Sequence, residues 1–288
     1  MGAAPCLLSL GTICGCIAVA CVAIAFSTDN WLEYSVNRVA ILTTMSQTSD
    51  DPQYAEVPLN LNRTLIYFPR TIGLWRICFP MEIPYGVDVY RSPTDTSCVN
   101  VDYPKDLDSG MDAWNRARVH LMRTILALFI AGFAMELLSF FVGVFGCWRR
   151  SPGLLVTTGT FMILAWLLDA GALAIWHGVD YMETKRMQFP TNVYYTYRTW
   201  PPILQQYTTR NYSWSFMLAW IGCGMALVSA MFLLGGAASL RAERRREKER
   251  NAQYMLPVYG NYGEKNAPYY AHAYPGPHYY YSSNSYRY

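Results

Sequence analysis

Residues 71–101 read TIGLWRICFPMEIPYGVDVYRSPTDTSCVNV, and this stretch decides how the rest of the sequence is interpreted. It contains Cys78 and Cys98, the two cysteines that lie outside long apolar runs. Side chains alternate along residues 71–79, with Leu74 and Cys78 on one face and Trp75 on the other, which predicts a strand. The two cysteines are either unrelated thiols or a disulfide that joins two strands of a small extracellular sheet. We favour the disulfide.

The composition favours a membrane protein. Of the 288 residues, 52% are hydrophobic and 15% are charged, whereas a soluble domain carries about a quarter charged residues. The net charge of +3 and the lack of a basic patch interleaved with aromatic residues argue against a nucleic-acid partner. The remaining cysteines all lie in or beside apolar runs, so Cys78 and Cys98 are left as the one pair for an oxidising compartment.

Four apolar runs are long enough to cross a bilayer, which takes about 20 residues. They cover residues 6–26, 122–147, 153–176 and 214–240. No basic segment precedes the first run and no small-residue cleavage site follows it, so we interpret it as a retained helix rather than a signal peptide. Residues 1–240 are thus predicted to form one membrane domain, with extracellular segments at 27–121 and 177–213. Residues 241–288 form a cytoplasmic basic helix and a disordered, tyrosine-rich tail.

Charge and glycosylation signals agree on the orientation of the four spans. Arg149 and Arg150 fill the short loop between spans two and three, and the basic run RAERRREKER (241–250) follows span four. Basic loops favour the cytoplasmic side. Asn62 and Asn211 begin Asn-x-Ser/Thr acceptor sequences for N-glycosylation, and both fall on the opposite side. The sequence predicts a multi-pass glycoprotein of the plasma membrane with both termini in the cytoplasm.

The first extracellular segment is predicted to form a five-stranded antiparallel sheet. Its strand patterns are separated by Pro, Gly, Asn and Asp residues, and they cover residues 31–36, 63–68, 71–79, 87–90 and 97–101. Residues 27–120 contain eight basic and twelve acidic side chains, so this extracellular face is acidic.

Two acidic residues lie inside predicted spans, Glu136 in the second and Asp169 in the third. Intramembrane acids are costly and mark functional sites by default. No Lys or Arg lies at their depth, while Ser139, residues 157–160 and Trp166 offer hydrogen-bonding groups. We favour neutral or hydrogen-bonded packing groups over a proton or ion path.

Gly11 and Gly15 lie four residues apart in the first span and leave a flat groove on one helix face. We expect this groove to pack inside one bundle rather than to form a homodimer. The tail carries eleven tyrosines in residues 251–288. It is a candidate docking strip for phosphotyrosine adaptors, a weak ligand for PDZ domains, or simply low-complexity sequence.

Several of these residues together resemble the signature of the claudin and peripheral-myelin-protein superfamily, over about residues 1–240. They are Trp31, Gly73, Leu74, Trp75, Cys78, Cys98 and an arginine before the second span, either Arg118 or Arg123. The resemblance implies a left-handed four-helix bundle under a five-stranded extracellular sheet. It also implies the Cys78–Cys98 disulfide and a position for Trp75 near the outer membrane surface. Claudins usually place the two cysteines about ten residues apart, so the spacing here departs from their pattern.

Two strings are most similar to one branch of that superfamily. GLWRIC (73–78) and NYSWSF (211–216) resemble the calcium-channel gamma subunits and the transmembrane regulators of AMPA receptors. This resemblance implies an auxiliary subunit that binds the pore-forming subunit of a channel or receptor, at the plasma membrane or at synapses. The alternative is a junction protein that binds itself or related claudin-like proteins in cis or in trans. In either role membrane lipids are partners.

No pattern in the sequence indicates an enzyme. The four histidines, His120, His177, His272 and His278, are scattered along the chain. Neither HExxH, GxSxG, a glycine-rich phosphate loop nor paired metal-ligand spacing occurs. We therefore predict no catalytic residues, no metal site and no cofactor.

Overall fold

The computed structural model describes residues 4–47, 57, 61–83, 86–92, 96–101, 103, 113–186, 197 and 200–255, without the side chains of 253–255. The chain divides into two units, residues 1–245 and residues 246–288. Most of the predicted tyrosine-rich tail lies outside the described residues, and the predicted domain boundary at residue 240 stays a prediction. The architecture below is that of the first unit, whose last helix continues to residue 255.

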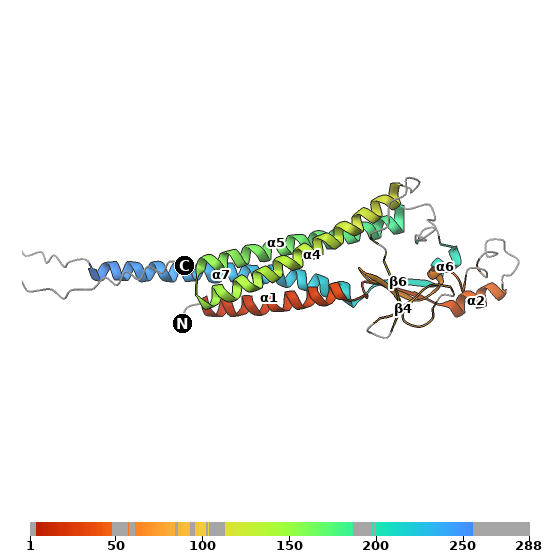
Figure 1. Ribbon diagram of the computed structural model, residues 1–288, viewed down its shortest axis with the longest axis horizontal. Coiled ribbons are helices and arrows are strands. Elements are labelled where there is room, and N and C mark those ends of the chain that lie inside the picture. The colour runs from red at the N-terminus through yellow and green to blue at the C-terminus, as the bar shows by residue number, and fades with distance from the viewer. Residues whose placement is uncertain are drawn as a thin grey trace, which may run out of the picture. The chain divides into compact units, whose positions relative to one another are not determined.

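Four helices in the described part of the chain are long and apolar enough to cross a membrane, which confirms the predicted membrane fold (Figure 1). They are α1 (Ala4–Ser27), α4 (Ala113–Trp148), α5 (Pro152–Tyr181) and α7 (Trp214–Met255). A π-helical turn, η3 (Met182–Arg186), continues α5. Helix α4 begins earlier and α7 ends later than the predicted spans, because a helix does not have to end where its apolar stretch ends.

Small residues let the helices approach each other closely. A Cβ atom on Gly143 of α4 would lie 3.0 Å from Thr158 of α5, and one on Gly159 would lie 2.7 Å from Leu234 of α7. The turn between α4 and α5 places Arg150 in the left-handed region at φ 46°. Without a hydrophobic driving force inside a bilayer, such close backbone packing is a main source of helix association.

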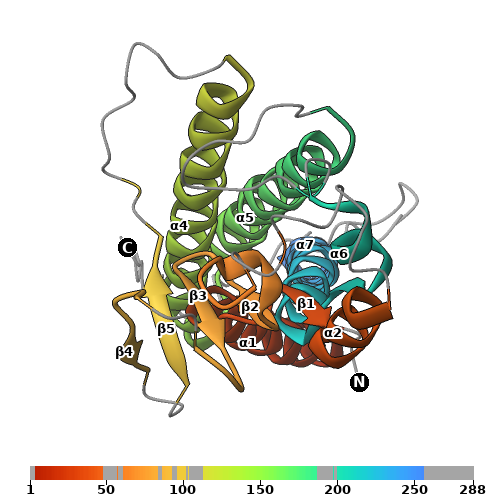
Figure 2. The same ribbon diagram turned by 90° about the vertical axis from the view of Figure 1, so that its right-hand side faces the viewer.

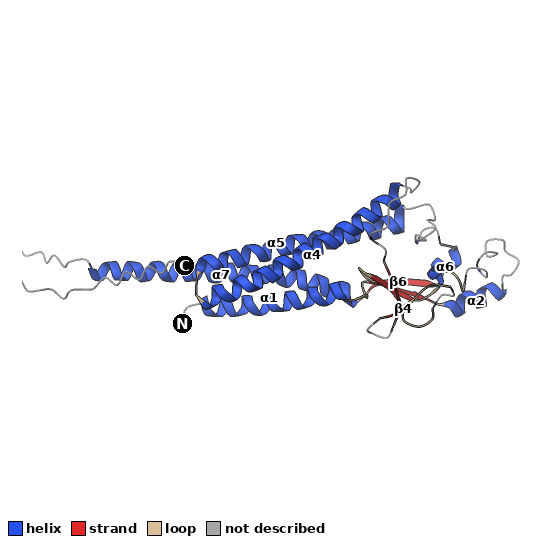
Figure 3. Cartoon of the chain, in the orientation of Figure 1, coloured by secondary structure: helices blue, strands red, loops and turns tan. Residues whose placement is uncertain are grey.

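The segments between α1 and α4 and between α5 and α7, which are predicted to be extracellular, form a six-stranded antiparallel sheet with the order β4-β5-β3-β2-β1-β6 (Figures 2 and 3). Its strands are β1 (Leu32–Val36), β2 (Arg70–Ile72), β3 (Arg76–Phe79), β4 (Tyr90–Arg91), β5 (Ser97–Asn100) and β6 (Thr208–Tyr212). The sixth strand comes from the second extracellular segment, which the sequence did not indicate. It pairs with β1 over five residues, so it fastens the second segment to the sheet that the first one forms.

Two predicted strands are wrong in detail. The single strand predicted at 71–79 is a hairpin of β2 and β3, because residues 73–75 turn and the Gly73 amide donates to the Arg76 carbonyl at 2.8 Å. The strand predicted at 63–68 is instead a 3₁₀ turn, η2 (Leu65–Tyr67). Arg70 explains this turn, since its buried guanidinium donates to the carbonyls of Leu65, Ile66 and Phe68. Burial lowers the pKa of Arg70 to about 10.

Two short helices, α2 (Arg38–Gln47) and α6 (Pro202–Gln206), accompany the sheet. Ile41 of α2 and Leu204 of α6 are buried in one apolar cluster with Tyr34 of β1 and Phe79 of β3. The sheet therefore has an apolar core of its own, separate from the core that joins it to the helices.

Candidate functional site

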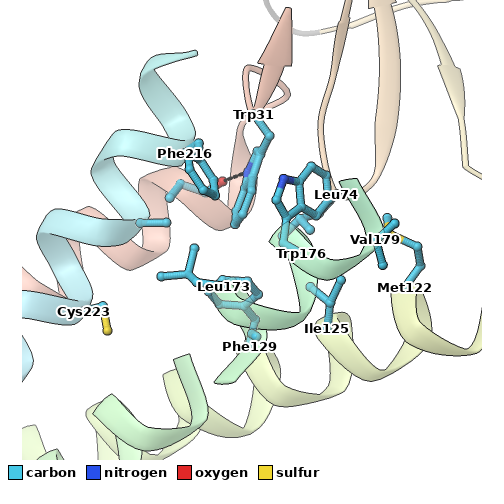
Figure 4. Close-up of a cluster of buried hydrophobic side chains, with 13 residues drawn as sticks. Trp31, Leu74, Met122, Ile125, Phe129, Leu173, Trp176, Val179, Phe216 and Cys223 are labelled. Carbon is cyan, nitrogen blue, oxygen red and sulfur yellow. Dashed lines mark hydrogen bonds between the residues drawn. The ribbon is translucent and has the colours of Figure 1, made fainter. Parts of the chain in front are cut away.

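Trp31 lies at the point where the sheet meets the helices. It lies four residues after the end of α1, is fully buried, and donates its indole N–H to the Ala25 carbonyl at 2.8 Å. Its ring centroid lies 5.3 Å from that of Phe129 on α4, 5.1 Å from Trp176 on α5 and 5.8 Å from Phe216 on α7 (Figure 4). One indole thus contacts all four long helices. We call the buried apolar side chains around this indole, which include Phe129, Trp176 and Phe216, the Trp31 cluster.

Residues 73–75, the GLW turn, reach the same place from the sheet. Leu74 is fully buried in the Trp31 cluster (Figure 4). Trp75 packs edge-on against the ring of Phe26 at 5.1 Å, and its indole N–H donates to the Phe26 carbonyl at 2.9 Å. The turn therefore caps the outer end of α1.

An ion pair fixes the GLW turn against the chain that leaves α1. Arg76 donates through Nε to Asp29 Oδ1 at 2.9 Å, and its Nη2 lies 2.6 Å from Asp29 Oδ2. Burial raises the pKa of the Asp29 carboxyl, and the Arg76 guanidinium offsets part of that rise. A Cβ atom on Gly73 would lie only 2.5 Å from the Asp29 Cα, so this close approach requires glycine.

The two candidate arginines before the second span have different contacts. Arg123 donates from Nε and Nη2 to the Tyr103 carbonyl, at 3.0 and 2.6 Å, and the Tyr103 hydroxyl donates to the Leu74 carbonyl at 2.5 Å. Arg118 instead forms an ion pair with Glu183 in η3. Arg123 therefore connects α4 to the GLW turn through Tyr103.

Strand β6 is anchored to both α5 and α7. Tyr212 stacks on Phe216 at 4.5 Å, and its hydroxyl donates to Asp180 Oδ2 at 2.8 Å. Arg210 forms an ion pair with the same carboxylate and donates to the Tyr34 hydroxyl at 2.9 Å. Burial raises the pKa of Tyr34. Asp180 thus holds two residues of β6 at the outer end of α5.

The predicted disulfide between Cys78 and Cys98 is confirmed. The two residues are direct partners in the pairing of β3 with β5. Both cysteines are buried, so the disulfide is shielded from solvent.

Both predicted glycosylation acceptors are exposed. Asn62 lies in a turn, where its side-chain oxygen accepts a hydrogen bond from Arg38 at 2.6 Å. Asn211 lies on β6, at the edge of the sheet. Their glycosylation stays a prediction.

The glycine pair of α1 faces α7. A Cβ atom on Gly11 would lie 3.0 Å from Leu233, and one on Gly15 would lie 3.1 Å from the Ser229 hydroxyl. The Ser229 hydroxyl donates to the Gly11 carbonyl at 2.8 Å. The glycine face of α1 therefore packs against α7 of the same chain, as the sequence led us to expect.

Glu136 and Asp169 are both fully buried, and neither carboxylate has a hydrogen-bond partner among the described residues. The predicted hydrogen bonds from neighbouring hydroxyls are absent there, because the Thr158 hydroxyl donates to the Leu154 carbonyl one turn earlier in its own helix. Asp169 packs onto Gly132, one turn before Glu136 on α4, so the helices bring the two acids into one region of the core.

The sequence did not single out several residues of this site. Asp29, Tyr103 and Asp180 act through partners that are distant in sequence, so no local pattern marks them. Trp176 had a usable signal, because aromatic residues at the ends of spans form the interfacial belt of membrane proteins. Within the described residues, no three His, Cys, Asp or Glu side chains gather as metal ligands.

Comparison with known proteins agrees with this arrangement. A family model described as PMP-22/EMP/MP20/Claudin tight junction matches residues 16–235. That range includes Trp31, the GLW turn, both bonded cysteines and most of the four spans. No curated protein matches the chain in sequence. The signature residues, the bundle and the extent of this match lead to one conclusion: the chain is a multi-pass membrane protein that belongs to the PMP-22/EMP/MP20/claudin family.

Proposed function

We propose that this protein is a non-enzymatic auxiliary subunit, similar to the calcium-channel gamma subunits, that binds the pore-forming subunit of an ion channel or receptor. One observation carries this proposal. The strings GLWRIC and NYSWSF, which resemble the gamma-subunit branch, meet at the Trp31 cluster, where Leu74 and Phe216 are both buried. The residues that carry the resemblance therefore form one structure.

That structure couples the sheet to the helices. The Trp31 cluster, the ion pair of Asp29 with Arg76 and the contact of Asp180 with β6 all join extracellular residues to helix ends. A partner that binds the sheet would thereby move or hold the helices. A partner that binds the helices would in the same way move or hold the sheet. An auxiliary subunit needs this property to alter gating.

The outer face of α7 next to the Trp31 cluster is the surface that we assign to a partner helix. Met217, Trp220 and Ile221 are 53%, 43% and 52% exposed there. Large apolar side chains on an outer helix face pack against another membrane helix as readily as against lipid.

Affinity purification from native membranes in mild detergent, followed by mass spectrometry, tests the proposal. We expect a channel or receptor pore-forming subunit among the recovered proteins, and about tenfold less of it with Met217→Ala/Ile221→Ala, equivalent to about 1.4 kcal/mol. Phe141→Ala on α4, where the side chain is 61% exposed, is the matched control. Recovery of junction and scaffold proteins alone would overturn the proposal.

A cell-junction protein is the second candidate. The matching family model carries the description of tight-junction proteins. Two exposed apolar side chains of the predicted extracellular part also support this role: Val39 and Met81 are 71% and 82% exposed, and the ion pair of Arg38 with Glu82 joins the segments that carry them. This candidate predicts accumulation at epithelial cell contacts and an altered transepithelial resistance, both lost with Val39→Asp/Met81→Asp. Even distribution over the cell surface would contradict it.

A further inference from the structure

The bundle contains a cavity of about 100 Å³ that all four long helices line. Gly15 of α1, Met162 of α5 and Leu233 of α7 contribute to its wall. Its mouth lies between α1 and α4, because Cys16 and Phe140 line it and are also exposed on the outer faces of those helices. In a membrane these faces contact hydrocarbon, so the cavity opens toward lipid rather than toward water.

Glu136 is the acidic residue in the wall of this cavity. Its side chain is fully buried, so a molecule in the cavity meets a carboxyl oxygen only after a side chain of the wall shifts, and neither oxygen has a hydrogen-bond partner among the described residues. A buried polar group without a partner costs about 1–3 kcal/mol or more. An occupant that supplies the missing hydrogen bond would recover part of that cost.

The other polar groups of the wall limit the chemistry of the occupant. The hydroxyls of Ser139, Thr158 and Ser229 donate their hydrogens to the carbonyls of Thr158, Leu154 and Gly11, at 3.0, 2.9 and 2.8 Å. These hydroxyl hydrogens are therefore not available to a ligand. The rest of the wall is mostly apolar, with side chains such as those of Phe140 and Leu233.

Position along the helix limits the occupant further. Glu136 lies twelve residues before Trp148, the last residue of α4, which is about 18 Å at about 1.5 Å per residue. The hydrocarbon layer is about 30 Å thick, so this carboxyl group lies near its middle. A molecule that reaches it from the side must be soluble in hydrocarbon.

We propose that this cavity binds a small lipid-soluble molecule that carries one hydrogen-bond donor, an alcohol or an amine, with the donor on a carboxyl oxygen of Glu136. The apolar body of the ligand lies against the side chains of the wall. A water molecule occupies about 30 Å³ in the liquid, so the cavity holds the polar end of the ligand and about two more heavy atoms, and a longer chain extends through the mouth into lipid. This site is independent of the proposed auxiliary function.

Photolabelling of the full-length protein in phosphatidylcholine vesicles tests the proposal. The probe is octanol carrying a diazirine group, and mass spectrometry locates the adducts. We expect saturable labelling at the cavity wall, centred on Glu136. Excess octanol or octylamine should displace the probe, while octane, which has no donor, should not. Displacement by only octanol or only octylamine would identify which donor the site accepts.

A pair of variants separates the cavity from the general lipid surface. Cys16→Phe places a ring at the mouth and should lower labelling of the cavity wall about tenfold, a loss of about 1.4 kcal/mol in binding free energy. Ile17→Phe adds the same ring at the neighbouring position, which is exposed but does not line the cavity, and should leave labelling unchanged. Equal displacement by octane and octanol, or labelling that is the same in both variants, would overturn the proposal.

Discussion

At the scale of single residues, the contact between the sheet and the helix ends depends on a few side chains. Each of them touches both a long helix and the chain of the sheet. Trp31 fills the space between the helix ends, and its indole N–H donates a hydrogen bond to the Ala25 carbonyl in the last turn of α1. Arg123 stabilises the GLW turn indirectly, through Tyr103. Such residues tolerate little change, because each replacement loses apolar packing and a hydrogen bond together.

Gly73→Ala tests the close approach of the GLW turn to Asp29. The added methyl group would overlap the Asp29 backbone, so the turn must shift and the folded protein should lose about 1–3 kcal/mol. Thermal unfolding of the purified protein in detergent measures this loss. Gly224→Ala is the matched control, because a Cβ atom there meets nothing within 4 Å. Equal melting temperatures for both variants would contradict the role given to Gly73.

At the scale of elements, the sheet is held at three places. The disulfide joins β3 to β5, the GLW turn joins the β2–β3 hairpin to α1, and Asp180 joins β6 to α5. The pairing of β6 with β1 completes this arrangement, since it connects two segments that are far apart in sequence.

Removal of the disulfide should prevent export of the protein. In the loop-entropy model, a loop of about 20 residues contributes about 3 kcal/mol, a large share of the stability of a small sheet. We expect Cys78→Ser and the double variant Cys78→Ser/Cys98→Ser to be retained in the secretory pathway, as surface biotinylation would show. Cys16→Ser, on the outer face of α1, should reach the surface normally. Normal delivery of the double variant would show that the bond is dispensable.

Asp180→Asn should loosen β6 while the rest of the sheet stays intact. The change removes the negative partner of Arg210 and weakens the bond from Tyr212, each worth about 1–3 kcal/mol when charged and partly buried. Hydrogen exchange followed by mass spectrometry should show faster exchange in residues 208–212. Asp88→Asn, at an exposed position, serves as the control. Faster exchange throughout the sheet would instead point to general unfolding.

At the scale of the whole molecule, the predicted orientation places the sheet outside the cell and both termini in the cytoplasm. Asn62 and Asn211 lie on exposed parts of the sheet side, and glycan transfer takes place only in the lumen of the secretory pathway. We expect Asn62→Gln to remove one glycan, visible as a mobility shift. Epitope tags on either terminus should bind antibody only after the cells are permeabilised. Binding to intact cells would reverse the orientation.

Much of the molecule could be predicted because its signals are local or compositional. Twenty apolar residues in a row need no partner to be recognised as a span, and the membrane leaves few other structures open to them. The pairing of Cys78 with Cys98 followed from elimination and from the resemblance to a family. In residues 71–79 the alternation of side chains continues through the tight turn at 73–75, so periodicity alone predicts one strand and does not locate the turn of the hairpin.

Composition and motif spacing were enough to predict the membrane class, the four spans and the family signature, and elimination among the cysteines favoured the Cys78–Cys98 disulfide. The structure was needed to show that β6 joins the sheet, that Arg123 is linked to the GLW turn through Tyr103, and that Glu136 lines a cavity with no hydrogen-bond partner among the described residues. The physical reason is that strand pairing, ion pairing and the satisfaction of buried polar groups depend on which distant segments meet, and short-range patterns do not encode that choice.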